Sequence, residues 1–189
     1  MKAPLGPVFA LVLTATIVTG CGKSHTAAAA PASASAPIPA EQVAAKVTWS
    51  TGPVTVIHHP AVPPVPVVTG IRYAGHPQEG YDRIVFDIQG GAPGYSARYV
   101  GQVVADGSGR PVSVPGNRFL LVVLNPAQAH TESGTVTVTG VHHVGLPTLQ
   151  AYAVVGDFEG HVSIALGLTA MAGYRVGELS GRIYVDVAH

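Results

Sequence analysis

The sequence predicts an all-β fold, an antiparallel β-sandwich over residues 67–189 that follows a disordered tether rich in alanine and proline. Three observations support this prediction. Apolar and polar side chains alternate with a period of two, turn-forming residues separate the alternating segments, and no stretch shows a long apolar stripe with helical period. The roughly 120 residues after the tether are enough for one domain and too few for two.

The clearest alternation occurs in residues 83–88 and again in residues 182–187. The apolar rows are Ile84, Phe86 and Ile88 in the first segment and Ile183, Val185 and Val187 in the second. Both segments also read Arg-Ile-x-x-Asp followed by an aliphatic residue. This shared pattern predicts paired or equivalent strands, although one short match does not establish an internal repeat.

Six further segments have the composition of strands: residues 95–104, 119–124, 135–141, 149–155, 161–168 and 174–179. Strong turn signals lie between several of them, at residues 90–94, 106–109 and 125–126. Many short strands joined by turns favour a sandwich over a sheet covered by helices.

The first 20 residues have the order of a signal peptide. Lys2 precedes an apolar run from Leu5 to Val18, and the small residues Thr19 and Gly20 follow. The run of about 14 residues is shorter than the roughly 20 that a helix needs to cross a bilayer. We therefore interpret residues 1–20 as a targeting segment.

Val18-Thr19-Gly20-Cys21 resembles the lipobox of bacterial lipoproteins, and Cys21 is the only cysteine of the chain. The resemblance implies lipid on the Cys21 sulfur, cleavage before it, and a chain anchored in the cell membrane on the extracytoplasmic face. Two acyl chains suffice for stable anchoring where one does not. The alternative is an ordinary secretory signal with an incidental cysteine.

Residues 21–66 are interpreted as the lipidated cysteine and a linker, because alanine, proline, serine and threonine dominate them. Residues 54–57 have the composition of a short strand, but the prolines at 60, 63, 64 and 66 remove backbone donors from any ladder beyond it. The adjacent pair His58 and His59 lacks the further ligands that a metal site needs. We expect most of this segment to be disordered.

Composition argues against nucleic acid as a partner. Ten basic residues balance ten acidic ones, and Lys2, Lys23 and Lys46 all lie outside the predicted domain. We expect no metal and no cofactor.

Two sets of polar residues are candidates for binding. Tyr81, Arg83, Arg98 and Tyr99 combine aromatic rings, which stack on sugars, with guanidinium groups, which bind carboxylates. The structural alternative, which we favour, is that Arg83 pairs with Asp87 or a cross-strand acid and that Tyr95 and Tyr99 fill the sandwich.

Asp157, Glu159 and His161 form the second set, because they share one face if the strand continues through them. A cation site is one interpretation. We favour a solvent-facing edge or a turn at Gly156 and Gly160.

No catalytic motif is evident. The sequence has no His-Glu-x-x-His zinc motif, and Ser96 and Ser108 do not lie in a Gly-x-Ser-x-Gly elbow. We therefore expect the protein not to be an enzyme.

Several linked motifs resemble the AMIN-like domain of actinobacterial lipoproteins. They are Gly75-His76-Pro77, the run from Tyr81 to Asp87, Gly94-Tyr95, Arg98-Tyr99-Val100, the run from Gly156 to Gly160, Gly167-Leu168, Tyr174-Arg175-Val176 and the terminal run from Arg182 to Val187. This resemblance covers essentially all of residues 67–189. It implies a β-sandwich related to the AMIN domain, a non-catalytic module that localises cell-wall amidases and secretion pores.

Three functions remain open at this point. The resemblance favours a lipoprotein whose domain binds peptidoglycan or another cell-wall polymer without catalysis. The alternative is a scaffold that docks another envelope protein through a strand edge or an apolar patch. A small hydrolase is the third and the least favoured.

Overall fold

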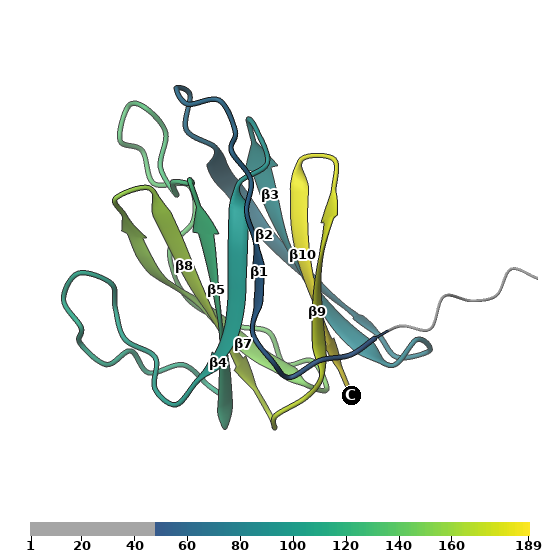
Figure 1. Ribbon diagram of the computed structural model, residues 1–189. Helices are drawn as coiled ribbons and strands as arrows, with labels where there is room; N and C mark the ends of the chain where they lie inside the picture. The colour runs from purple at the N-terminus through teal and green to yellow at the C-terminus, as the bar shows by residue number, and fades with distance from the viewer. Residues whose placement is uncertain (1–47) are drawn as a thin grey trace, which may run out of the picture. The chain divides into compact units, whose positions relative to one another are not determined.

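The computed structural model describes residues 48–189 as two antiparallel β-sheets (Figure 1). The predicted signal segment 1–20, Cys21 and the tether up to residue 47 lie outside the described residues. The all-β prediction is confirmed for the described part, which contains no helix, and so no helix there is long enough to cross a membrane.

One sheet has six strands in the order β1-β4-β5-β8-β7-β6, and the other has four in the order β2-β3-β10-β9. The six-stranded sheet contains β1 (Val54–Val56), β4 (Gly94–Val100), β5 (Arg118–Asn125), β8 (His161–Leu168), β7 (Leu149–Phe158) and β6 (Gly140–His143). The four-stranded sheet contains β2 (Val67–His76), β3 (Tyr81–Gln89), β10 (Arg182–Ala188) and β9 (Tyr174–Leu179).

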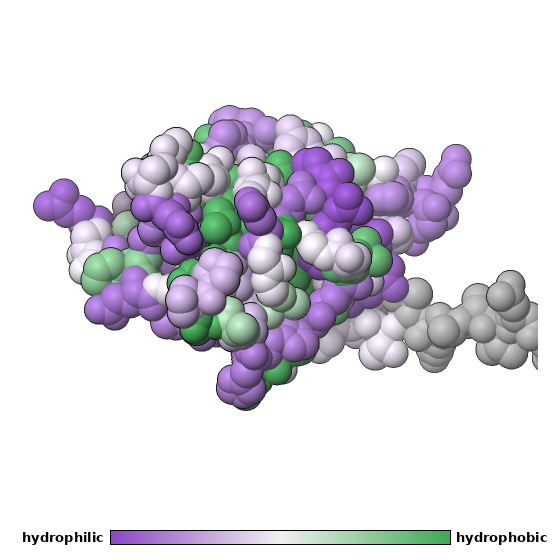
Figure 2. Space-filling view, turned by 90° about the horizontal axis from the view of Figure 1, so that it is seen from above, coloured by the Kyte–Doolittle hydropathy of each residue, from purple (hydrophilic) through white to green (hydrophobic). Residues whose placement is uncertain are grey.

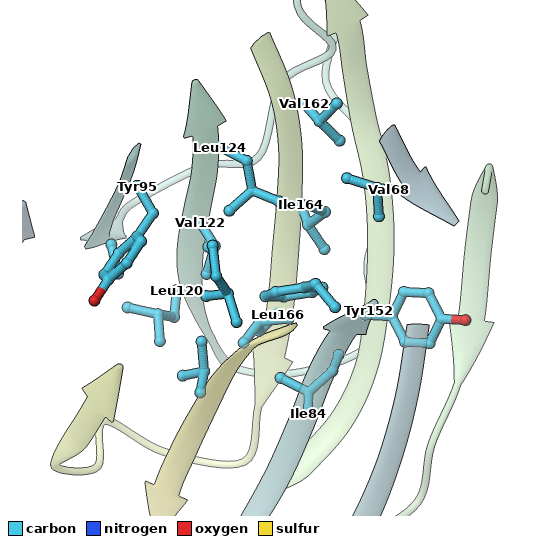
Figure 3. Packing of buried hydrophobic residues seen from close by; sticks show 14 of the residues in the cluster. Val68, Ile84, Tyr95, Leu120, Val122, Leu124, Tyr152, Val162, Ile164 and Leu166 are labelled. Carbon is cyan, nitrogen blue, oxygen red and sulfur yellow. The ribbon is translucent and has the colours of Figure 1, made fainter. Parts of the chain in front are cut away.

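The main core lies between the two sheets (Figure 3). The six-stranded sheet contributes the alternating residues Leu120, Val122 and Leu124 of β5, all fully buried. The four-stranded sheet contributes the apolar rows that the sequence predicts, and of these Ile84, Phe86, Val185 and Val187 are fully buried. The period-two rows are therefore confirmed as the inner faces of β3 and β10.

A second, smaller core covers the outside of the six-stranded sheet. Val103 and Val114, from the segment between β4 and β5, pack there on alanines of β7 and β8 such as Ala153 and Ala165. Gly167 permits the close crossing, because a Cβ at that position would collide with the Pro115 carbonyl oxygen. Since both faces of β8 are covered, all of its residues after His161 are buried.

Residues before the expected domain boundary at Val67 also pair with the sandwich. Ser50 bridges Tyr174 through two backbone hydrogen bonds, and β1 pairs with β4. The tether prediction is therefore wrong for the parts of residues 48–66 that pair with the sandwich, whereas residues 61–64 are exposed. The short pairing anticipated at residues 54–57 is confirmed for Val54–Val56, and it ends before the proline-rich stretch.

Strand β2 was not among the predicted strands, for a physical reason. Its register against β3 shifts between Val68 and Gly70, and such a bulge interrupts the alternation that marks a strand in sequence. The strand predicted at residues 135–141 is also displaced, since β6 covers Gly140–His143.

Candidate functional site

Within residues 48–189, no segment covers the outer face of the four-stranded sheet as Val103 and Val114 cover that of the six-stranded sheet. On β3, Tyr81, Arg83, Val85 and Asp87 are half-buried and alternate with buried core residues. We call this surface the arginine face. Its polar and aromatic members are Arg72, His76, Tyr81, Arg83, Asp87, Arg175, Arg182, Tyr184 and Asp186, with Trp49 beside them.

Strand register explains why the charges pair on this face. Arg83 lies opposite Asp186, and Asp87 lies opposite Arg182, in the antiparallel pairing of β3 with β10. Each strand places an arginine four residues before an aspartate, so the antiparallel arrangement matches each arginine with the acid of the other strand. The shared Arg-Ile-x-x-Asp pattern therefore belongs to two paired strands, one of the two arrangements that the sequence predicts.

The buried triad consists of Arg83, Asp186 and Arg175. Asp186 accepts hydrogen bonds from Arg83 Nε at 2.5 Å and Nη2 at 2.8 Å, and from Arg175 Nε at 2.6 Å. Its side chain is fully buried, whereas those of Arg83 and Arg175 are 23% and 30% exposed. The hydrogen bond to Asp186 raises the pKa of Arg83. Asp186 is thus a buried charge that two guanidinium groups neutralise.

The exposed triad consists of Arg72, Asp87 and Arg182. Arg72 donates from Nε to Asp87 Oδ2 at 2.7 Å and from Nη2 to Oδ1 at 2.6 Å, while Arg182 donates from Nε to Oδ1 at 3.2 Å. The side chains of Arg72 and Arg182 are 58% and 49% exposed. Hydrogen bonding from Arg72 is the main cause that lowers the pKa of the Asp87 carboxyl.

Aromatic rings cover the guanidinium groups of the buried triad. The Arg83 Cζ atom lies 4.2 Å from the centre of the Tyr184 ring and 5.3 Å from that of Tyr81. The Arg175 Cζ atom lies 5.1 Å from the centre of the Trp49 ring. His76 stacks on Tyr81 with ring centres 4.6 Å apart. These stacked planes hold the side chains in place.

Gly177 makes room for Tyr184 on this face. The two residues are partners across β9 and β10, and a Cβ on Gly177 would collide with the Tyr184 hydroxyl. Tyr184 therefore lies across the backbone of β9, where its ring meets Arg83.

The structure separates the first predicted set of site residues. Tyr81 and Arg83 lie together on the arginine face, with Arg83 bound to the cross-strand acid Asp186. Arg98 and Tyr99 belong to β4 of the other sheet. Arg98 is exposed, whereas the Tyr99 hydroxyl donates to the Ala172 carbonyl at 2.7 Å and accepts from the Ala172 amide at 3.0 Å.

The second set is separated as well. Asp157 accepts hydrogen bonds from the Ala129 amide at 3.0 Å and from His130 Nδ1 at 2.6 Å. Glu159 has a φ of 49° in the turn between β7 and β8, so it does not continue the row of Asp157. His161 lies beside Asn125, with Nε2 2.9 Å from Nδ2. Of the favoured interpretation, only the turn at Gly160 is found, because Gly156 lies within β7 and Phe158 is 59% exposed.

Only Tyr81 and Arg83 of the arginine face were candidates in the sequence, and the other eight members were missed: Trp49, Arg72, His76, Asp87, Arg175, Arg182, Tyr184 and Asp186. Trp49 lies in the segment interpreted as tether, and Arg72 lies on the unpredicted β2. The repeated Arg-Ile-x-x-Asp pattern contained the signal for Asp186, because antiparallel pairing of the two copies places it opposite Arg83.

Two hollows lie elsewhere in the described residues. Seen from above, the surface carries hydrophobic residues between hydrophilic ones (Figure 2). One hollow, of about 410 Å³, is lined by His58, His59 and His161, among others. His58 Nε2 binds Glu178 at 2.9 Å. Within residues 48–189, no group of three histidine, cysteine or acidic side chains is placed to hold a metal ion.

The other hollow, of about 670 Å³, is lined mainly by hydroxyl, amide and aliphatic side chains, with Glu132 at its edge. The arginine face differs from both hollows because it combines four guanidinium groups with aromatic rings on one sheet surface. It can bind anionic groups through the guanidinium N–H groups that the two aspartates leave free.

Comparison with known proteins agrees with this fold. A family model described as the AMIN-like domain matches residues 66–189, which include every strand except β1. No curated protein and no solved structure matches the chain. The resemblance noted in the sequence is confirmed, and the chain belongs to the AMIN-like domain family.

Proposed function

We propose that this protein is a non-catalytic cell-envelope lipoprotein that binds peptidoglycan, or another cell-wall polymer, through the arginine face of its AMIN-like domain. The observation that carries the proposal is the placement of the arginines. Of the seven arginines in the chain, Arg72, Arg83, Arg175 and Arg182 lie together on this uncovered face.

The charge of the face supports an anionic ligand. Two aspartates balance only half of its four guanidinium groups, although the whole chain has a net charge of zero. Peptidoglycan offers peptide carboxylates and sugar rings, which match guanidinium groups and aromatic side chains. Because a polymer repeats these groups, several weak contacts on neighbouring domains add up to firm retention.

The anchor completes the proposal. Lipid on Cys21 would hold the chain at the extracytoplasmic face of the cell membrane, with the residues between Cys21 and the domain as the connection to the wall. We expect Cys21→Ala to release a folded domain from the membrane fraction. A variant that stays membrane-bound and fully processed would contradict the anchor.

The direct test of wall binding is co-sedimentation of residues 22–189 with purified cell wall at several salt concentrations and pH values. This chain contains the whole compact unit Ala45–His189. We expect the domain in the pellet, with less retention at high salt because exposed ion pairs are screened. Recovery entirely in the supernatant under all conditions would contradict the proposal.

Absence of catalysis is part of the proposal and needs its own measurement. We expect no turnover of soluble wall fragments, with or without added zinc. Product formation that depends on the domain would favour the small hydrolase instead.

One observation favours the scaffold as the second candidate. Strand β2 is an edge of its sheet, and Thr69 and all residues from Arg72 to Gly75 are exposed, with Tyr73 44% exposed. An exposed edge is a template on which another chain can add a strand. A single dominant protein cross-linked to β2 in cells, without association with the wall, would favour the scaffold.

A further inference from the structure

We infer that the exposed triad of Arg72, Asp87 and Arg182 is a subsite for a carboxylate of the wall polymer, with Arg182 as its principal donor. This inference rests on the proposed function and assigns it a ligand group. It also separates the roles of the two triads, which the sequence pattern makes look equivalent.

The hydrogen bonds of the two arginines differ in a way that leaves Arg182 open. Arg72 uses both Nε and Nη2 on Asp87, so one full edge of its guanidinium group is occupied. Arg182 uses only Nε, and within residues 48–189 its Nη1 and Nη2 have no hydrogen-bond partner. The edge formed by these two nitrogens matches the two oxygens of a carboxylate.

Accessibility points to the same triad. Asp186 of the buried triad is fully buried, and the rings of Tyr81, Tyr184 and Trp49 lie against its arginines. Arg72 and Arg182 have about half of their side chains exposed. We therefore assign a structural role to the buried triad and a binding role to the exposed one.

Charge sets the class of ligand. Two guanidinium groups around one carboxylate leave a surplus of one positive charge, which matches a singly charged oxyanion. Asp87 holds both guanidinium groups by hydrogen bonds, so less side-chain freedom is lost when the ligand binds. Asp87 also shows that this site accepts a planar carboxylate between two arginines.

The test compares wall binding by the chain of residues 22–189 and by its variants Arg182→Gln and Arg72→Gln. Arg98→Gln is the matched control, because Arg98 is an exposed arginine on the other sheet. Three wall preparations are used: untreated, amidated at its carboxylates, and stripped of phosphate-containing polymers. Thermal unfolding and the fluorescence of Trp49, the only tryptophan, check that each variant is folded.

We expect Arg182→Gln to weaken binding to untreated wall by about tenfold or more, the effect of losing a charge-assisted pair of hydrogen bonds. Arg72→Gln should weaken binding less, because the Arg72 guanidinium group already uses Nε and Nη2 on Asp87 and has fewer free N–H donors. Binding by Arg98→Gln should stay within about twofold of that by the unchanged chain. Amidation should reduce binding by the unchanged chain to the level of Arg182→Gln, and removal of phosphate polymers should leave binding intact.

The possible failures are distinguishable. If the unchanged chain does not bind untreated wall, the proposed function itself fails. If it binds, but Arg182→Gln binds equally well or amidation has no effect, only the carboxylate subsite is wrong. Loss of binding on removal of phosphate polymers alone would assign the triad to a phosphodiester and overturn the inference.

Discussion

Arg83 on β3 and Asp186 on β10 face each other across the strand pair, and Asp87 and Arg182 repeat this relationship in the opposite direction. The two pairs differ in environment. Asp186 is fully buried, whereas Asp87 is 27% exposed. The same Arg-Ile-x-x-Asp pattern therefore produces two different environments. Aromatic rings exclude water from the Arg83–Asp186 pair, whereas the Asp87–Arg182 pair remains open to solvent.

Asp186→Asn tests the structural role of the buried triad. Loss of the carboxylate leaves Arg83 and Arg175 close together without a counter-charge, and we expect a loss of about 3–5 kcal/mol in the free energy of unfolding. Urea denaturation measures it. Asp87→Asn should cost clearly less because solvent screens its partners, and equal losses would contradict the different roles of the triads.

Gly177→Ala tests how Tyr184 is placed. The added Cβ would force the Tyr184 ring off β9 and away from Arg83, at a cost of about 0.5–2 kcal/mol from the lost cation-π contact. Ring proton shifts of Tyr184 in NMR spectra report its displacement. Gly101→Ala is the control, since a Cβ there meets nothing within 4 Å. An unchanged Tyr184 environment in the Gly177 variant would refute the prediction.

Asp82 supports the fold from inside the domain. It is fully buried, and its Oδ2 accepts the amides of Thr148 and Leu149 at 2.7 and 2.9 Å. Asp82→Ala leaves two buried amides without an acceptor, so we expect a loss of about 2–5 kcal/mol in unfolding free energy. Glu79→Ala, at an exposed position nearby, should change stability little. Comparable midpoints for the two variants in urea would disprove this role.

Tyr95 gives the domain a defined response to alkali. Burial, and secondly the carboxylate of Glu178, raise the pKa of its hydroxyl to about 12 from the usual 10. The folded state favours the neutral phenol of Tyr95. The contribution of this group to the free energy of unfolding is therefore complete below pH 10 and declines as the pH rises through 12. Tyr95→Phe should therefore lose less stability than the unchanged chain between these values. Parallel curves of thermal midpoint against pH would exclude this effect.

The strands with strict alternation could be predicted from sequence because each has an apolar face in the core and a polar face on the outside of the sheet. Residues 83–88 and 182–187 are of this kind, and their inward rows agree with the structure. Strand β2 escaped prediction because its bulge shifts the register after Val68, and residues 48–66 escaped because a composition typical of linkers concealed their packing against the sandwich.

The site was less predictable than the fold. Tyr81 and Arg83 were identified from residue type, and the shared Arg-Ile-x-x-Asp pattern left open whether residues 182–187 pair with β3 or are only equivalent to it. Sheet order alone brings Arg175 of β9 to Asp186, and only the path of the chain before β1 brings Trp49 to Arg175. Arg98 and Tyr99 have the same residue types as Arg83 and Tyr81, yet they belong to the other sheet.

The most direct test of the arginine face is an NMR titration of the isotope-labelled chain of residues 22–189 with soluble fragments of digested cell wall. We predict that the amide shifts which change on binding cluster on β2, β3, β10 and β9, together with the indole signal of Trp49. Changes confined to residues 101–117 or to the six-stranded sheet, or no changes at saturating fragment concentration, would contradict the assignment of wall binding to this face.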